Sequence, residues 1–209
     1  MVFANRNEAA DRLAVALAAY KSRHPLILAI PRGAVPMGWR LARALDGELD
    51  VVLVRKLRAP SNPEFAIGSI DESGWTYIAD YALAAGGTET YLQHETQAQL
   101  DTIKKRRARY TPLRSPIDPA GRIVIVVDDG LATGSTMISA LHALRAKKPA
   151  RLICAVPVAP PDTLEKIRPY ADEVVCLEAP PHFQAVGQFY ADFPQVEDDE
   201  VEAILRQAG

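Results

Sequence analysis

Hydrophobic and polar residues form blocks along this 209-residue chain that predict alternating strands and helices. Short apolar runs typical of buried strands occur at 25–33, 50–56, 121–130, 151–159 and 173–179. Stretches with the length and pattern of helices occur at 6–21, 35–46, 88–110, 135–147 and 162–170. Because strands and helices alternate, the pattern predicts an α/β fold: a parallel-sheet core with helices on both faces.

Local signals support several of these boundaries. The pair Asn5 and Glu8 has the spacing of a capping box and predicts the start of the first helix. Asp162 and Glu165 predict the start of a later helix in the same way. The sequence Pro-Arg-Gly at 31–33 predicts a tight turn directly after the first strand.

Two regions depart from the regular alternation. Residues 59–78 contain turn residues and short alternating pieces, which predict a hairpin or a mobile flap. The tail from 178 carries aromatic residues, a turn and a short final helix. We expect one domain over 1–209, in which 60–116 form a flap or insertion and 178–209 form a tail or hood element.

Composition narrows the class of protein. The chain is 48% hydrophobic and 24% charged, with a net charge of −2, which argues against nucleic-acid or membrane binding through net charge. Cys154 and Cys176 lie in apolar runs, and we interpret them as reduced core residues. The sequence has no basic and apolar leader pattern and no apolar run of membrane-spanning length, so we expect a cytoplasmic protein.

Reactive side chains gather where predicted strands end, the edge of a parallel sheet at which ligands bind. Asp128 and Asp129 follow the strongest strand, and a small-residue loop with three hydroxyls follows them. Backbone N–H groups in such a loop, leading into a helix, bind phosphate. The carboxylates can accept hydrogen bonds from vicinal hydroxyls or hold Mg²⁺ through water. Together these groups suit a ribose 5-phosphate, whereas the spacing fits neither a Walker A loop nor a Rossmann fingerprint.

The stretch IVIVVDDGLATGST at 123–136 is similar to the motif with which type I phosphoribosyltransferases bind 5-phosphoribosyl 1-pyrophosphate (PRPP). The residues 31–33 resemble the pyrophosphate loop of that family, and the pair 55–56 resembles the cationic end of its second strand. The stretches LAIPRGAVPMG, LDVVLVRKLRAPSNPEFAIGSI and HFQAVGQFYADF look like a subgroup of uncharacterised bacterial phosphoribosyltransferases. The resemblance covers about residues 3–205.

This resemblance implies a Mg²⁺-dependent pentosyltransferase of nucleotide metabolism, in which a nucleobase or similar nitrogen acceptor displaces pyrophosphate from the anomeric carbon of PRPP. It implies that Asp128 and Asp129 bind the ribose hydroxyls and hold Mg²⁺ indirectly. It implies that Arg55 and Lys56 neutralise the departing pyrophosphate. The remaining PRPP-binding residues that it implies are Arg32, Gly33, Ala34, Ala132, Thr133, Gly134, Ser135 and Thr136.

The acceptor is less well specified. The tail faintly resembles the corresponding part of purine phosphoribosyltransferases, which implies that Phe183 stacks on the base and that the neighbouring His182 lines the acceptor pocket. Those purine enzymes carry a lysine after the strand matching 151–159, and no lysine occurs here before Lys166, which argues against a 6-oxopurine. Alternatively, Phe183 packs the tail onto the sheet, which is the preferred interpretation for Phe189 and Tyr190.

The same residues are compatible with two functions other than phosphoribosyl transfer. The main alternative is a regulatory protein that keeps the fold and senses PRPP or a nucleotide without turnover, and a weaker one is a hydrolase or phosphorylase of a sugar phosphate. The basic run KKRRAR at 104–109 predicts a solvated or pyrophosphate-facing helix surface more than a nucleic-acid patch. We expect PRPP and a small-molecule acceptor as partners, no nucleic acid or membrane, and a possible homodimer.

Overall fold

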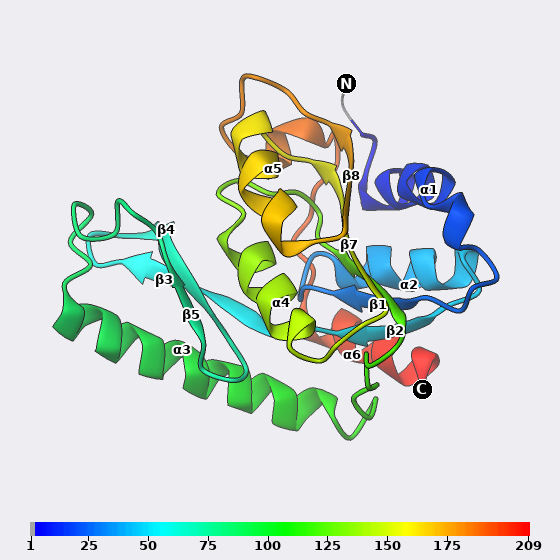
Figure 1. Cartoon of the computed structure of the whole chain (residues 1–209), viewed down its shortest axis with the longest axis horizontal. Helices are drawn as coiled ribbons and strands as arrows, with labels where there is room; N and C mark the ends of the chain where they lie inside the picture. Colours follow the sequence, from blue (N-terminus) through cyan, green and yellow to red (C-terminus); the bar gives the residue numbers. More distant parts are fainter. Residues whose placement is uncertain (1–2) are drawn as a thin grey trace.

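The computed structural model describes residues 3–209, so residues 1 and 2 of the predicted domain lie outside the described part. Its core is a parallel sheet in the order β2–β1–β6–β7–β8 (Figure 1). The strands are β1 (Leu26–Ala29), β2 (Glu48–Val51), β6 (Ile123–Val127), β7 (Arg151–Val158) and β8 (Glu173–Glu178). The predicted parallel α/β core is confirmed.

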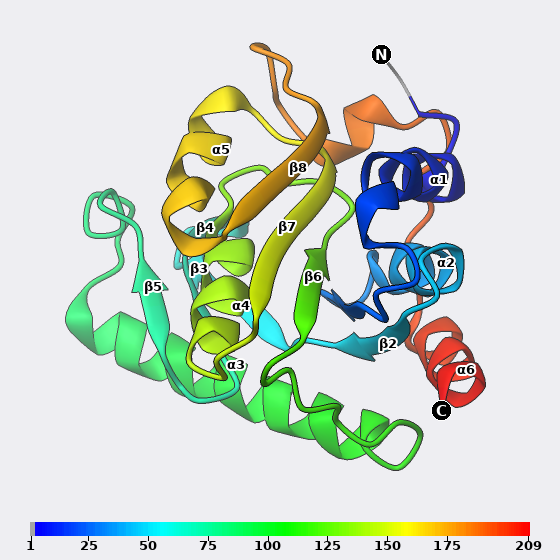
Figure 2. The same cartoon turned by 45° about the vertical axis from the view of Figure 1, so that its right-hand side comes forward.

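Helices cover both faces of this sheet (Figure 2). On one side lie α1 (Arg6–Ala16) and α2 (Val35–Ala44), and on the other lie α4 (Ser135–Arg145) and α5 (Pro161–Ile167). A final helix, α6 (Asp198–Ala208), packs beside α2 and β2.

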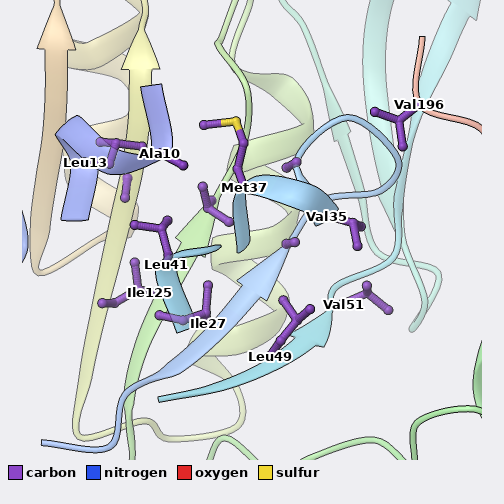
Figure 3. Packing of buried hydrophobic residues seen from close by; sticks show 14 of the residues in the cluster. Ala10, Leu13, Ile27, Val35, Met37, Leu41, Leu49, Val51, Ile125 and Val196 are labelled. Atoms are coloured by element: carbon purple, nitrogen blue, oxygen red, sulfur yellow. The ribbon is translucent and has the colours of Figure 1, made fainter. Parts of the chain in front are cut away.

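Each strand supplies side chains to both faces in alternation. In β6, Ile125 and Val127 belong to the hydrophobic cluster under α1 and α2, whereas Val124 and Val126 belong to the cluster under α4. Figure 3 shows Leu13 and Leu41 in the first cluster with Ile125. Burial on both faces explains why this strand reads as an unbroken apolar run.

The prediction of one strand over 50–56 is wrong. The parallel strand β2 ends at Val51, and Val54 begins β3 (Val54–Ala59), which belongs to a second, antiparallel sheet of order β3–β4–β5. Because Val52 and Leu53 between them are also buried, the hydrophobic pattern does not reveal the break. Arg55 and Lys56 therefore lie on the second sheet, not at the end of a parallel strand.

The second sheet fills the region for which the sequence predicted a hairpin or flap. The strands β4 (Asn62–Asp71) and β5 (Thr76–Ile78) form an antiparallel hairpin, as predicted. The long helix α3 (Glu89–Tyr110) begins at Thr88, whose side chain accepts the N–H of Tyr91, and runs along this sheet (Figure 1). Movement of this region as a flap stays a prediction.

The predicted helix starts differ in outcome. The Asn5 side chain accepts hydrogen bonds from the N–H groups of Asn7 and Glu8, so the predicted cap of α1 is confirmed. The α-helix ends at Ala16, earlier than predicted, and a separate 3₁₀ turn follows at Ala18–Tyr20. Asp162 does not cap α5. That helix starts with Pro161 in its first position, where proline's fixed φ suits the first turn, and 3₁₀ turns follow at Arg168–Tyr170 and later at Val186–Phe189.

Both cysteines are free thiols in the sheet, as predicted. Cys154 is buried in β7 and Cys176 is half-buried in β8, and burial raises the pKa of both thiols, that of Cys176 to about 11. Among the described residues, no helix combines the length and the apolar character needed to cross a membrane.

Candidate active site

The topology of the parallel sheet creates a crevice at its carboxyl edge. After β1 the chain enters α2 on one face, and after the neighbouring β6 it enters α4 on the other, so the two loops diverge. Such a switch point is where parallel α/β sheets bind ligands. A cavity of about 600 Å³ lies here, the carboxyl-edge cavity. Among the predicted site residues it is lined by Gly33, Arg55, Lys56, Asp128, Asp129, Ala132, Thr133, Gly134 and Thr136.

Two adjacent carboxylates form one side of the cavity. Burial and the neighbouring Asp129 carboxylate raise the pKa of Asp128 well above its ordinary value. Burial also raises the pKa of Asp129, although the Arg6 guanidinium opposes the shift. Arg6 donates to Asp129 Oδ2 through Nε at 3.0 Å and Nη2 at 2.8 Å. Asp129 is therefore balanced by a cation of the chain, whereas no ion pair to Asp128 is found among the described residues.

The Arg6 side chain is itself held by the tail of the protein. Its Nη1 donates to the Pro194 carbonyl at 2.6 Å, and its guanidinium lies 3.7 Å above the Phe193 ring. Tyr190 stacks on Phe193 at 4.6 Å and donates its hydroxyl to the Asp129 carbonyl at 2.6 Å. The N-terminal helix and the tail thus meet behind the carboxylates.

The backbone also joins these distant parts of the chain. The Phe3 N–H donates to the Phe189 carbonyl at 2.7 Å, and the Ala191 N–H donates to the Phe3 carbonyl at 2.8 Å. Sequence reasoning missed Arg6 because it belongs to no motif, and Tyr190 because it has the pattern of a packing residue. Spatial proximity is the only signal that singles out either residue.

The loop after β1 approaches the carboxylates closely. A Cβ atom on Gly33 would lie 2.2 Å from Asp129 Oδ2, so only glycine fits here without displacing that side chain. The peptide bond between Pro31 and Arg32 is cis. The Arg32 side chain forms an ion pair with Glu197, just before α6, at 3.2 Å. Arg32 is not among the residues that line the cavity. Ala34 is buried at the start of α2, so this loop presents mainly backbone to the site.

The loop after β6 forms a tight turn that leads into the start of α4. Gly134 precedes the helix with φ of 77°, a left-handed conformation that favours glycine. Thr163 of α5 supports the loop by donating its hydroxyl to the Ala132 carbonyl at 2.6 Å. Ser135 is buried, and its carbonyl accepts the Ser69 hydroxyl at 2.7 Å. Because the first N–H groups of a helix lack intrahelical acceptors, this fixed turn suits a phosphate.

Cations from the second sheet and α3 face the carboxylates across the cavity. They are Arg55, Lys56, Arg58 and Arg106. Arg58 pairs with Glu95 at 3.1 Å, whereas Arg55 Nε donates to a neutral amide, Gln99 Oε1, at 2.9 Å. Burial lowers the pKa of Arg55, and the guanidiniums of Arg106 and Arg58 lower it further. Sequence reasoning missed Arg58, and it placed Arg106 within a run that faces solvent or pyrophosphate.

The basic run of α3 divides between several roles. Arg106 lines the carboxyl-edge cavity. Arg107 donates a hydrogen bond to the Glu72 carboxylate, and Arg109 forms an ion pair with Asp198 of α6 at 3.5 Å. The exposed cations of the run are Lys104, Lys105 and Arg109, of which Arg109 is paired with carboxylates of α6.

The predicted acceptor residues lie beside the cavity without lining it. His182 is exposed, and Phe183 packs on Phe189 with ring centroids 5.1 Å apart. The nearby residues that do line the cavity are Gln184 and Val186. The packing interpretation of Phe189 and Tyr190 agrees with their burial.

The donor set of the site suits a weakly held Mg²⁺. The described residues contain no group of three or more His, Cys, Asp or Glu side chains able to hold a metal ion. The buried, adjacent carboxylates at 128 and 129 have raised pKa values, so a cation beside them would relieve their repulsion. They fit a Mg²⁺ that takes most of its oxygen ligands from substrate and water.

Comparisons of this chain with known proteins agree on one protein family. Residues 4–194 match the phosphoribosyl transferase domain family. The chain is 38% identical over 208 residues to "Putative phosphoribosyl transferase Rv0571c" of Mycobacterium tuberculosis H37Rv, and equally to its counterpart in strain CDC 1551. The match covers 99% of this chain and 47% of those relatives, so the chain spans about half of their length. The crystal structure of TT1426 from Thermus thermophilus is 45% identical, with a TM-score of 0.82 and 99% of both chains covered.

Proposed function

The chain belongs to the phosphoribosyl transferase domain family, and on that premise we propose that it is a Mg²⁺-dependent phosphoribosyltransferase that uses PRPP. In the proposed reaction a nitrogen acceptor, such as a nucleobase, attacks the anomeric carbon of the ribose, and pyrophosphate departs.

One observation carries the proposal. Three separate motifs, at 31–33, 55–56 and 128–136, all contribute to one cavity of about 600 Å³ at the switch point of the sheet. The cavity offers a phosphate-binding turn, two carboxylates for a diol, and four cations opposite them. This set of groups matches the three parts of PRPP: its 5-phosphate, its ribose hydroxyls and its pyrophosphate.

The geometry suggests how the residues divide the work. The turn at 132–136 would hold the 5-phosphate, and Asp128 and Asp129 would accept hydrogen bonds from the ribose hydroxyls. As the bond to pyrophosphate breaks, negative charge grows on the leaving group. Arg55 and Lys56 would stabilise that charge, with Arg58 and Arg106 beside them. When bound, Mg²⁺ would supply additional positive charge to stabilise the leaving group, and Asp128 and Asp129 would hold it indirectly.

The acceptor would enter between the second sheet and the loop that follows β8. Gln184 and Val186 from that loop and Phe65 from β4 line this part of the cavity. An apolar wall with one amide suits a flat heterocycle that needs a hydrogen bond to fix its orientation. Phe183 and His182 stay proposed acceptor residues that would reach the cavity if the loop closes.

The decisive experiment is to incubate the protein with PRPP, Mg²⁺ and a pool of nucleobases and to analyse the products by mass spectrometry. We expect a nucleotide mass that is absent without protein, together with free pyrophosphate. The double variant Asp128→Asn, Asp129→Asn is the matched control, and we expect it to fold and to give no product. Product formation by this variant at an unchanged melting temperature would contradict the site assignment.

The alternative is a protein that senses PRPP or a nucleotide without turnover. A sensor needs the phosphate turn, whereas stabilising a departing pyrophosphate needs the cations opposite, and the cavity contains both. Saturable PRPP binding, with PRPP intact after incubation with the complete pool, would favour the sensor.

A further inference from the structure

The buried face of α3 carries polar residues at positions where a helix normally presents apolar ones. Glu95 and Gln99 lie one helical turn apart and are only 8% and 2% exposed, and the buried Ile103 continues the same row. The row packs on β3, the strand that bears Arg55. Because burying a polar side chain is unfavourable unless it is hydrogen-bonded, the partners of these two residues indicate what they contribute.

Gln99 holds the Arg55 guanidinium through one of its nitrogens. The Gln99 Oε1 atom accepts a hydrogen bond from Arg55 Nε at 2.9 Å. The two Nη groups of Arg55 have no hydrogen-bond acceptor among the described residues, and Arg55 lines the carboxyl-edge cavity. A guanidinium carries five N–H donors in one rigid plane, so fixing Nε orients the Nη donors and leaves them available to an anion.

Glu95 sets the orientation of the Gln99 amide. Its Oε1 atom accepts from Gln99 Nε2 at 2.9 Å, so the amide must turn its oxygen toward Arg55. The same Glu95 oxygen accepts from the backbone N–H and from Nε of Arg58, both at 3.1 Å. Glu95 therefore pairs directly with Arg58 and contacts Arg55 only through the neutral amide.

The neutral amide leaves the charge of Arg55 uncompensated. A carboxylate in the place of Gln99 would fix the guanidinium equally well, but it would offset the positive charge. Burial lowers the pKa of Arg55, and the guanidiniums of Arg106 and Arg58 lower it further. The nearby Glu95 carboxylate opposes this shift without cancelling it. An anion in the cavity would relieve the imbalance.

We propose that Gln99 is a positioning residue for the leaving group: it directs the Arg55 guanidinium toward the pyrophosphate of the substrate without neutralising it. The inference rests on the proposed function and extends it to a residue that does not line the cavity. Gln99 acts only through Arg55, and Glu95 fixes the amide that does so.

A double-mutant cycle tests whether Gln99 acts through Arg55. Gln99→Met keeps an unbranched side chain but removes the acceptor. We expect its affinity for inorganic pyrophosphate with Mg²⁺, measured by calorimetry, to fall about fivefold and kcat to fall about tenfold. In the Arg55→Ala background, Gln99→Met should cause no further loss of either quantity, because the cation that Gln99 positions is absent.

Gln99→Glu tests whether the neutrality of the amide matters. This variant keeps an oxygen for Arg55 Nε but adds a negative charge, so we expect pyrophosphate affinity to fall at least about tenfold. A merely structural contact with Arg55 would be kept or strengthened by the same change. The melting temperature is measured for both variants, and each tests the proposal if the other does not fold.

Gln97 provides the matched control on the same helix. It is exposed and donates to the exposed Asp101 at 2.9 Å. Gln97→Met and Gln97→Glu make the same chemical changes on the solvent side of α3. They should leave pyrophosphate affinity and kcat within about twofold of the wild-type values, because exposed charges are screened.

The proposal is overturned if Gln99→Met keeps wild-type pyrophosphate affinity and kcat, or if it lowers them equally with and without Arg55. It is also overturned if Gln99→Glu binds pyrophosphate as tightly as the wild type, or if the Gln97 variants lose as much as the Gln99 variants. A wild-type chain that binds pyrophosphate but forms no nucleotide contradicts the proposed function alone, since the cycle on pyrophosphate affinity still tests Gln99. A wild-type chain that binds no pyrophosphate overturns both.

Discussion

The two sides of the carboxyl-edge cavity differ in how far their charge is balanced by other groups of the chain. The carboxylate wall, Asp128 and Asp129, lies at the end of the parallel sheet. Arg6 and Tyr190, which we call its brace, contact Asp129 from behind. The cation wall, Arg55, Lys56, Arg58 and Arg106, rests on the second sheet and α3, where only Arg58 has an ion pair among the described residues. The carboxylate wall is therefore partly neutralised within the chain, whereas the cation wall depends on a bound anion for its balance.

The largest expected effect comes from removing charge from the cation wall. In Arg55→Ala, Lys56→Ala we expect kcat to fall about 10²- to 10³-fold, because charge on the leaving pyrophosphate loses its stabilisation, while PRPP affinity falls only about tenfold. Steady-state kinetics with the acceptor found by mass spectrometry, and calorimetric PRPP titration, check the two values.

The matched control for this variant is Lys104→Ala, Lys105→Ala, which removes the same charge from the exposed face of α3. It should leave kcat within about twofold, since exposed charges are well screened. If PRPP affinity falls more than kcat in the first variant, Arg55 and Lys56 only anchor the ground-state substrate.

The next effect tests the brace of the carboxylate wall. Arg6→Met leaves Asp129 buried without its cation, and breaking such a pair costs about 3–5 kcal/mol of unfolding free energy. We expect PRPP affinity to fall as well, because Asp129 becomes harder to ionise. Denaturant unfolding and PRPP titration measure both quantities.

The exposed pair of Arg40 and Asp11 provides the comparison for Arg6. Its side chains are 47% and 53% exposed, against 11% and 16% for Arg6 and Asp129. Arg40→Met should cost no more than about 1 kcal/mol. Equal losses of stability in the two variants would show that Arg6 does not brace the wall.

A third prediction concerns pH. The folded-state pKa of Asp128 is raised by burial and by Asp129, so the unfolded chain ionises first as the pH rises. The contribution of Asp128 to the stability of the native protein should therefore decrease from about pH 4 upward, through its raised folded-state pKa. Asp128→Asn should flatten this decrease and raise Tm near neutral pH by at least ~2 °C, about the effect of 1 kcal/mol in a chain of this size. Calorimetry from pH 4 to 8 tests it, and a lower Tm of the variant at pH 7 would refute it.

The smallest expected effect comes from the outermost part of the brace. Tyr190→Phe removes the hydroxyl bond to the Asp129 carbonyl and should cost about 1 kcal/mol, with a loss of PRPP affinity of a few-fold. Tyr20→Phe removes a buried hydroxyl bond to Glu173 at the opposite end of the sheet. Tyr20→Phe should lower the free energy of unfolding by a similar amount and leave PRPP affinity unchanged. An equal loss of PRPP affinity in this control would show that the effect of Tyr190→Phe is not specific to the brace.

The sequence predicts the parallel core and the carboxylate side well, because both depend on local order. The apolar strands, the glycine turn and the pair of aspartates are contiguous, and fixed βα connections bring residues 31–33 and 128–136 to one edge. The break between β2 and β3 is not predictable, since buried residues continue across it.

The braces and much of the cation wall come from long-range packing. Arg6 reaches Asp129 across 123 positions of sequence, and Arg106 reaches the cavity only because α3 packs on the second sheet.

The contact between the N-terminal helix and the tail has a consequence for the order of synthesis. Arg6 leaves the ribosome long before Phe193 and Pro194, which hold it. At about 5–20 residues per second, roughly ten seconds or more separate them, and during that time the strand bearing Asp128 and Asp129 is already available to fold. A nascent chain thus carries two acidic groups at its forming sheet edge before their brace exists, and synthesis of residues 193–194 is what allows Arg6 to be held behind them.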